Sequence, residues 1–345
     1  MIRQETFGLL PDGREVRLFT IANSFGESVQ LLNYGATIHS LTVLGRGGKL
    51  EDVVLGAPNA AGISQCSYMA GTIGRYSGRI PEGKCCVEGR EIQLERNIGR
   101  DFVHGASGNY ARKVFDAECS QEENKVVFSL RDDGEGGFGN EMDVKTTFIF
   151  GDDHCLQLCV EMTAEDTTIV NPTNHCYFNL SGCGKDARDM VLRIPTAMRV
   201  GRGANGAPNG TLRDVRETPA DFLEPKTVRH AMTIHPDGYF STLPAFYDEY
   251  YVFESANMKL EAELVSPSAG RKMQIYANGQ GMVFYNPANR APEPGKNGAI
   301  YQGYPALCLQ PGFVPNAVNC SSFLSPIVHK GETFRQHIHY VFSTF

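Results

Sequence analysis

The chain has 345 residues, of which 41% are hydrophobic and 21% are charged, as in ordinary folded domains. Its 32 basic and 39 acidic residues give a formal net charge of −7, and no basic run stands out, which argues against a nucleic-acid partner. No stretch approaches the roughly 18 apolar residues that span a bilayer, so no membrane partner is expected.

The cysteines and the N-terminal segment indicate the compartment. None of the ten cysteines forms a C-x-x-C pair, and Cys155 and Cys159 lie inside an alternating strand pattern. They are expected to be reduced, half-buried thiols rather than disulfides or zinc ligands. Residues 1–16 lack the apolar core of a secretory signal. A cytoplasmic location is expected, as a monomer or a homodimer.

Period-two alternation of apolar and polar residues dominates the chain and predicts antiparallel strands. Shorter strands are expected near 15–21, 28–33, 36–44, 85–94, 125–130, 191–195, 259–266, 273–277 and 281–286, and longer ones over 142–150, 155–162 and 334–342. Only 58–69 favours a helix. Many short strands between Gly- and Pro-rich turns indicate an all-β sandwich or barrel.

The segments between these strands contain no convincing linker or repeat, so residues 1–345 are expected to form a single domain. Two long runs rich in Gly, Pro and Asn, 201–208 and 287–298, are expected to be loops. Loops of this length in a compact domain are often functional, because a rigid sheet positions them over a site.

Metal and cofactor motifs are weak or absent. His337 and His339 form an H-x-H pattern on a strand face that is simply polar, so no metal site is expected there. The run Asp132–Glu135 resembles part of a calcium loop but lacks the rest of its spacing, and is expected to be a solvated turn. No phosphate-binding loop or dinucleotide fingerprint occurs.

Several polar residues stand in contexts suited to a sugar. Arg79 lies in the glycine-flanked run 74–80, and guanidinium groups offer a fork of donors for hydroxyl oxygens. His104 precedes a glycine at an expected strand end, and His175 lies in the run 171–182, which mixes amides and aromatics. Each pattern alone is also compatible with a purely structural role.

Two further candidates lie in the C-terminal half. Asp248 is a carboxylate inside an aromatic run, where it needs a polar partner such as a sugar hydroxyl. Gln310 ends an apolar strand just before a rigid Pro-Gly turn.

Taken in order, these segments resemble the aldose 1-epimerase family over nearly the whole chain. The matching segments are Asn33–Ile38, Gly74–Ile80, His104-Gly105, Asn174–Leu180, Asp248 and Cys308–Asn319. The resemblance implies a large antiparallel β-sandwich of the galactose mutarotase-like supersandwich type. It also implies an isomerase that interconverts the α and β anomers of a free hexose of the galactose or glucose type, without a cofactor.

The resemblance also implies roles for individual residues. His175 matches the general acid that protonates the ring oxygen, and His104 and Arg79 match groups that hold the sugar and steady developing charge. Asp248 matches the residue that accepts hydrogen bonds from ring hydroxyls. Arg75 is expected to be structural.

One position departs from the family pattern. The family's catalytic base is a glutamate where this chain has Gln310, and an amide is not a usable base near neutral pH. Three interpretations follow: an engineered Glu-to-Gln variant, a natural member that binds sugar without fast epimerisation, or a member in which Asp248 or Glu249 has become the base.

Two other functions compete with the enzyme hypothesis. A non-catalytic sugar-binding protein or sensor on the same scaffold would keep the pocket and lose the reaction. A hexose-phosphate epimerase would need added cations, for which only Arg202, Arg290 and Lys296 in the expected loops qualify.

Overall fold

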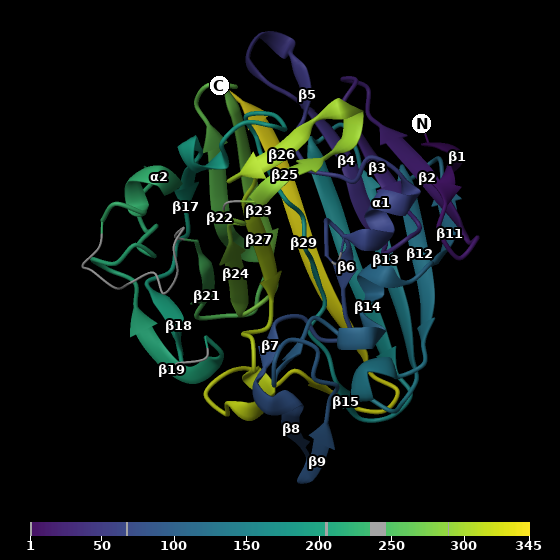
Figure 1. The fold of residues 1–345 in the computed structure, drawn as a ribbon, viewed down its shortest axis with the longest axis vertical. Coiled ribbons are helices and arrows are strands. Elements are labelled where there is room, and N and C mark those ends of the chain that lie inside the picture. The colour runs from purple at the N-terminus through teal and green to yellow at the C-terminus, as the bar shows by residue number, and fades with distance from the viewer. Residues whose placement is uncertain (1, 67, 204–205, 235–245, 289) are drawn as a thin grey trace.

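A computed structural model of the chain describes residues 2–66, 68–203, 206–234, 246–288 and 290–345, the side chain of Arg290 excepted. Strands dominate, as the alternation predicts (Figure 1). The α-helices of the described residues are α1 (Ala60–Gln65), inside the expected helical segment, and α2 (Val228–Ala231). No helix in this part of the chain is long and apolar enough to cross a membrane.

The largest layer is a nine-stranded antiparallel sheet. Its strands in spatial order are β11 (Asp116–Ser120), β12 (Lys125–Asp132), β13 (Met142–Phe150), β14 (Cys155–Ala164), β29 (Thr333–Thr344), β23 (Arg271–Ala277), β22 (Lys259–Ser266), β17 (Val191–Arg193) and β20 (Lys226–Thr227). In β13 the apolar residues Met142, Val144 and Phe148 are buried while their neighbours face outward, which confirms the half-buried strand predicted there.

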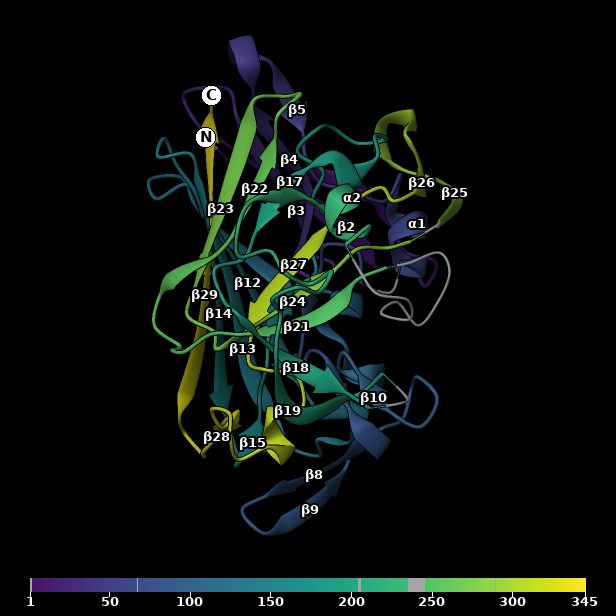
Figure 2. The ribbon, with the colours of Figure 1, turned by 90° about the vertical axis from the view of Figure 1, so that its left-hand side faces the viewer.

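Two five-stranded sheets complete the sandwich. The first contains β1 (Ile2–Leu9), β2 (Glu15–Ala22), β3 (Ser28–Leu32), β4 (Thr37–Leu44) and β5 (Leu50–Asp52). The second, in spatial order, contains β19 (Pro208–Asp214), β18 (Met198–Arg202), β21 (Asp248–Val252), β24 (Gly281–Tyr285) and β27 (Cys308–Gly312). Figure 2 shows β24 and β21 in front of the layer formed by β29, β14 and β13.

One hydrophobic core joins these layers. It contains Phe19 of the first small sheet, Phe128 of the large sheet and Phe284 of the second small sheet. The rings of Phe19 and Phe128 meet edge to face with centroids 5.5 Å apart. The architecture is therefore the large antiparallel β-sandwich expected from the sequence.

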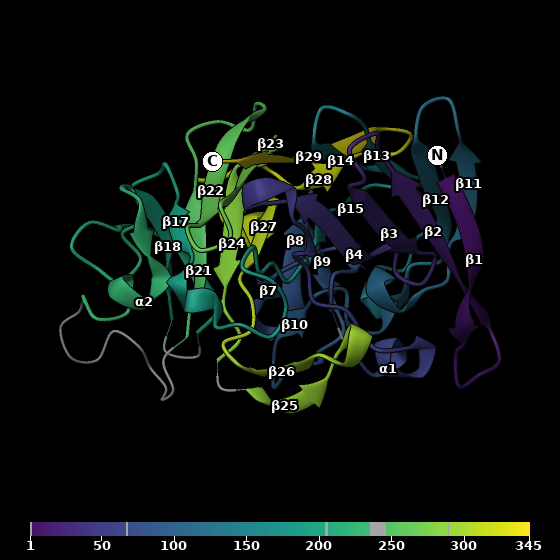
Figure 3. The ribbon, with the colours of Figure 1, turned by 90° about the horizontal axis from the view of Figure 1, so that it is seen from above.

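Short strand pairs connect the sheets and carry several of the candidate residues. They are β6 (Thr72–Ile73) with β16 (Thr173–Asn174), β7 (Arg79–Ile80) with β10 (Phe102–Val103), β8 (Lys84–Val87) with β9 (Arg90–Gln93), β15 (Thr168–Ile169) with β28 (Ile327–Val328), and β25 (Arg290–Pro294) with β26 (Ile300–Gly303). Seen from above, the β25–β26 hairpin and α1 lie on the side opposite β29 and β14 (Figure 3).

Some local predictions are wrong in detail. The single strand expected over 85–94 is the β8–β9 hairpin, which turns at Glu88 and Gly89, where both backbones have positive φ. The loop expected over 287–298 contains β25, because pairing with β26 supplies its main-chain hydrogen bonds. The loop expected over 201–208 begins in β18 and ends in β19, and residues 204–205 lie outside the described part.

Buried polar contacts fix two further segments. Lys296 follows β25, and its Nζ lies 2.6 Å both from the Asp52 carboxylate and from the His39 carbonyl oxygen, which pins the β25–β26 hairpin to the first small sheet. Asp132, expected in a solvated turn, is only 5% exposed because Arg75 pairs with it at 2.7 Å.

Candidate active site

The structure brings the five predicted site residues together. Arg79, His104, His175, Asp248 and Gln310 all line one cavity of about 330 Å³. Arg79 comes from β7, Asp248 starts β21, Gln310 lies in β27, and the two histidines follow β10 and β16. The cavity forms where the second small sheet meets the short strand pairs. Its lining therefore combines chain segments that lie far apart in the sequence.

The backbone aims His104 into the cavity through a tight turn. His104 and Gly105 both have positive φ, at 54° and 82°. The Nδ1 atom of His104 accepts a hydrogen bond from the Gly78 backbone N–H at 3.2 Å. The proton of the neutral ring is therefore on Nε2, which is a donor.

Aromatic rings surround His175. The rings of Tyr68 and Tyr177 are nearly parallel to the imidazole, at centroid distances of 5.9 and 5.0 Å. His104 meets His175 edge to face at 5.5 Å. This packing excludes water from the imidazole on several sides, and flat aromatic faces beside polar groups suit a sugar ring.

Both imidazoles are neutral at pH 7. Burial, together with the nearby charge of Arg79, lowers the pKa of His104 to about 4. Burial, together with the neighbouring His104, lowers the pKa of His175 to about 3. Among the described residues the buried Nδ1 of His175 has no hydrogen-bond partner, a state that is uncommon for a buried polar atom without a ligand or water.

These depressed pKa values predict a pH-dependent stability. A histidine in an unfolded chain has a pKa of about 6.5. Below that pH the unfolded chain therefore binds protons, while the two buried imidazoles of the folded chain stay neutral. The free energy of unfolding should therefore fall as the pH drops from about 6.5 towards 4. Urea unfolding at several pH values across this range tests the prediction. The free energy of unfolding should depend less steeply on pH in His175→Phe than in the wild type. The exposed-residue control His230→Phe should keep the wild-type slope, and equal slopes in all three proteins would contradict the prediction.

Two charged side chains among the described lining residues of the cavity have ion-pair partners. The Arg79 guanidinium pairs with Asp101 at 2.9 Å, and Asp101 also accepts the backbone N–H of Glu82. Asp248 pairs with Arg202 at 2.6 Å. Each ion pair neutralises one charge beside the cavity, so an uncharged ligand fits it best.

Position 310 supplies an amide rather than a carboxylate. Gln310 is 4% exposed and lies opposite Val283 of β24 in the strand register. Glu249, considered as a replacement base, does not line the cavity and pairs with Arg199 at 3.2 Å. Among the described residues, the carboxylate that lines the cavity is Asp248, which already pairs with Arg202.

Comparison with known proteins identifies the fold and the family. A family model described as aldose 1-epimerase matches residues 17–341. The chain belongs to the aldose 1-epimerase family. An aldose 1-epimerase from Haemophilus influenzae is 29% identical over 322 residues, covering 92% of each protein, and a galactose mutarotase from Rattus norvegicus is 30% identical over 349 residues, covering 99% of this chain and 98% of the relative.

Solved structures support the fold. An aldose epimerase homologue from C. elegans superposes with a TM-score of 0.85 at 23% identity, covering 95% of this chain and 98% of the other. A galactose 1-epimerase from Lactobacillus acidophilus gives 0.84 at 21% identity, covering 100% and 99%. At these sequence identities, the two structures support the supersandwich fold of this chain.

Some family-like residues of this aldose 1-epimerase family member do not line the cavity. Asn174 is buried and donates to the Ala70 carbonyl oxygen at 3.0 Å. Asn179 donates to the carbonyl oxygens of Lys185 and Pro305, both at 2.9 Å. Both amides satisfy backbone groups, so they hold the turns around His175.

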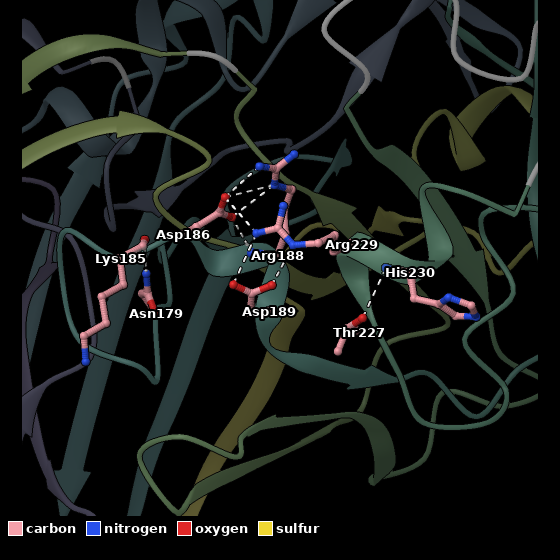
Figure 4. A network of polar contacts seen from close by, with 8 residues as sticks. All are labelled: Asn179, Lys185, Asp186, Arg188, Asp189, Thr227, Arg229 and His230. Atoms are coloured by element: carbon pink, nitrogen blue, oxygen red, sulfur yellow. Dashed lines mark hydrogen bonds and ion pairs between the residues drawn. The ribbon is translucent and has the colours of Figure 1, made fainter.

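The Asn179 turn leads into a surface network (Figure 4). Beyond Lys185, Asp186 pairs with both Arg188 and Arg229, and Asp189 pairs with Arg229. These ion pairs connect the segment 186–189, which follows the turn at Asn179, to α2. The network supports the fold of this chain and is not part of the cavity.

Sequence reasoning missed the apolar lining. The additional lining residues of this aldose 1-epimerase family member are mostly aromatic or aliphatic, namely Tyr68, Ile98, Val103, Tyr177, Phe246, Tyr250, Val283 and Tyr285, together with Gly78. Five of them, Gly78, Val103, Tyr177, Phe246 and Tyr250, lay inside segments already singled out, although not as lining residues. Tyr68, Ile98, Val283 and Tyr285 carry no local signal, because apolar residues are common in any strand.

Proposed function

We propose that this chain binds a free, uncharged hexose in the cavity and interconverts its anomers slowly, because an amide replaces the family's carboxylate base at position 310. The observation that carries the proposal is the meeting of Arg79, His104, His175, Asp248 and Gln310 in one cavity lined by tyrosines. A volume of about 330 Å³ lies at the small end of ligand pockets, which span roughly 300–1,000 Å³, as suits a single sugar ring.

Anomer exchange requires two proton transfers at the same centre. The anomeric hydroxyl loses its proton while the ring oxygen gains one, the C1–O5 bond breaks, and rotation about C1–C2 precedes closure with the proton roles reversed. In the proposed reaction the neutral His175 ring donates an N–H hydrogen bond to the ring oxygen, and the Gln310 carboxamide oxygen accepts a hydrogen bond from the anomeric hydroxyl. Because neither an amide nor a neutral imidazole readily transfers the proton, a water carries it from the anomeric hydroxyl to the ring oxygen, and the reaction loses about 10²–10⁴-fold.

Of the two rival functions, one is less well supported by the contacts of the site. A hexose-phosphate epimerase needs cations free for the phosphate, yet Arg202 pairs with Asp248 and Lys296 is buried against Asp52. The side chain of Arg290, the third candidate cation, lies outside the described part of the chain. A non-catalytic sugar-binding protein would use the same cavity and differ only in showing no exchange above the buffer rate. The assay below separates it from the proposal.

The proposal predicts measurable sugar binding that depends on Asp248. Calorimetry with galactose and glucose should show binding of at least one, and Asp248→Asn should weaken it about 10- to 100-fold, since a hydrogen bond to a charged group contributes ~1.5–3 kcal/mol. Asp214→Asn, at an exposed carboxylate of β19, is the matched control and should bind as the wild type does.

The reaction is followed by NMR exchange between the α and β anomers. At high protein concentration, we expect the α and β anomers to exchange faster than they do in buffer alone. Binding without any added exchange would favour the binding-protein alternative, and tighter binding of a hexose phosphate than of the free hexose would favour the phosphate alternative. Failure to bind either free sugar would contradict the proposed function.

A further inference from the structure

Strand geometry places Arg202, which does not line the cavity, beside the Asp248 carboxylate, which does. In the register of β18 with β21, Met198 lies opposite Val252 and Arg199 opposite Tyr251. Side chains alternate along a strand, so Arg202 shares a sheet face with Tyr250 and Asp248, while Arg199 and Glu249 share the other face. The sheet therefore sorts two arginines and two carboxylates into separate pairs.

Arg202, Tyr250 and Asp248 form one contact unit. The Nη2 atom of Arg202 lies 2.6 Å from Oδ2 of Asp248, and its guanidinium carbon lies 4.9 Å from the centroid of the Tyr250 ring. The Tyr250 hydroxyl lies 3.4 Å from the same Oδ2. Stacking on the ring limits the rotamers of the arginine, and the ion pair in turn fixes the carboxylate.

Arg202 carries its positive charge in this unit. Although burial opposes the charged form, the Asp248 carboxylate raises the pKa of Arg202 above its usual value. Asp248 and Tyr250 line the cavity, whereas Arg202 does not. Among the described residues, Arg202 and Tyr250 both contact Oδ2 of Asp248, which leaves Oδ1 for a ligand hydroxyl.

We propose that Arg202 is a positioning residue of the sugar site, which holds the Asp248 carboxylate in the orientation in which Oδ1 accepts a hydrogen bond from a sugar hydroxyl. This inference rests on the proposed function and adds to it a residue that does not touch the sugar. A guanidinium beside one oxygen of a carboxylate restrains the rotation of that carboxylate and leaves its other oxygen able to accept a hydrogen bond from a hydroxyl.

The test is a double-mutant cycle on hexose affinity in the full-length chain. Arg202→Met should weaken binding of the preferred sugar about tenfold or more, and Arg202→Lys should recover most of that loss because it keeps the charge. In the Asp248→Asn background, Arg202→Met should cost less than about twofold further. A merely structural arginine would show the same loss in both backgrounds and no recovery by lysine.

The matched control is Arg199→Met, on the same strand and paired with Glu249 outside the cavity. It should change the affinity less than about twofold. Urea unfolding of all variants identifies any that bind weakly because they are unfolded, and affinities are compared only among variants with cooperative transitions.

The outcomes separate the two proposals. If the wild type binds hexose and Arg202→Met binds equally well, or if its cost adds fully to that of Asp248→Asn, the positioning role is overturned and the proposed function stands. If the wild type binds neither sugar, the proposed function fails. In that case the wild type, Arg202→Met, Asp248→Asn and the double variant still test the pairing, because their urea unfolding midpoints show whether the two substitutions act independently. Additive changes of the midpoint would overturn the Arg202–Asp248 unit as well.

Discussion

Gln310→Glu should increase the rate of anomer exchange by about 10²–10⁴-fold, because it places a proton acceptor where the proposed site has only an amide. The substitution is nearly isosteric and the side chain already lines the cavity, so the sugar-binding groups should stay in place. Exchange of galactose and glucose anomers, followed by NMR or polarimetry at equal protein concentration, measures the gain.

The matched control changes the same residue type away from the cavity. Gln157→Glu alters β14 on the face that does not contribute to the core, and it should leave the exchange rate at the wild-type value. Sugar binding by Gln310→Glu without a faster exchange would contradict the assignment of position 310. The base would then have to come from elsewhere, and the Arg202→Met variant would be the next to examine for exchange.

Arg75→Met should destabilise the fold by about 3–5 kcal/mol, which is the usual cost of removing one partner of a buried ion pair. The Arg75 side chain is inaccessible and its Nε donates to Asp132 at 2.7 Å. The same carboxylate accepts the Tyr110 hydroxyl at 2.6 Å, and other donors of Arg75 bond Asn140. Without the arginine, Asp132 is a buried charge with no cation beside it.

Arg131→Met is the control for this prediction. Arg131 also pairs with three acidic residues, Glu141, Asp143 and Glu165, but its side chain is 44% exposed. Exposed pairs contribute roughly 0–1 kcal/mol, so the unfolding midpoint in urea should barely move. Equal losses for the two variants would show that burial is not what makes the Arg75 pair costly to break.

The fold class could be predicted from the sequence because strand alternation is a local property. In β13 every second side chain enters the core, and the pattern of Met142, Val144 and Phe148 is visible without any knowledge of partners. Strand boundaries within Gly- and Pro-rich runs could not be predicted. Whether residues near 290 form a strand depends on pairing with β26 and on Lys296 reaching Asp52, which are contacts between distant segments.

The sequence by itself determined which residue types were available for a sugar site, including the amide at position 310. Their convergence in one cavity, the neutrality of His104 and His175, and the pairing of Asp248 with Arg202 were decided only by the tertiary structure. The physical reason is that burial and charge partners are set by what packs around a side chain, and here that packing joins strands more than two hundred residues apart in the chain, as the span from Arg79 to Gln310 shows.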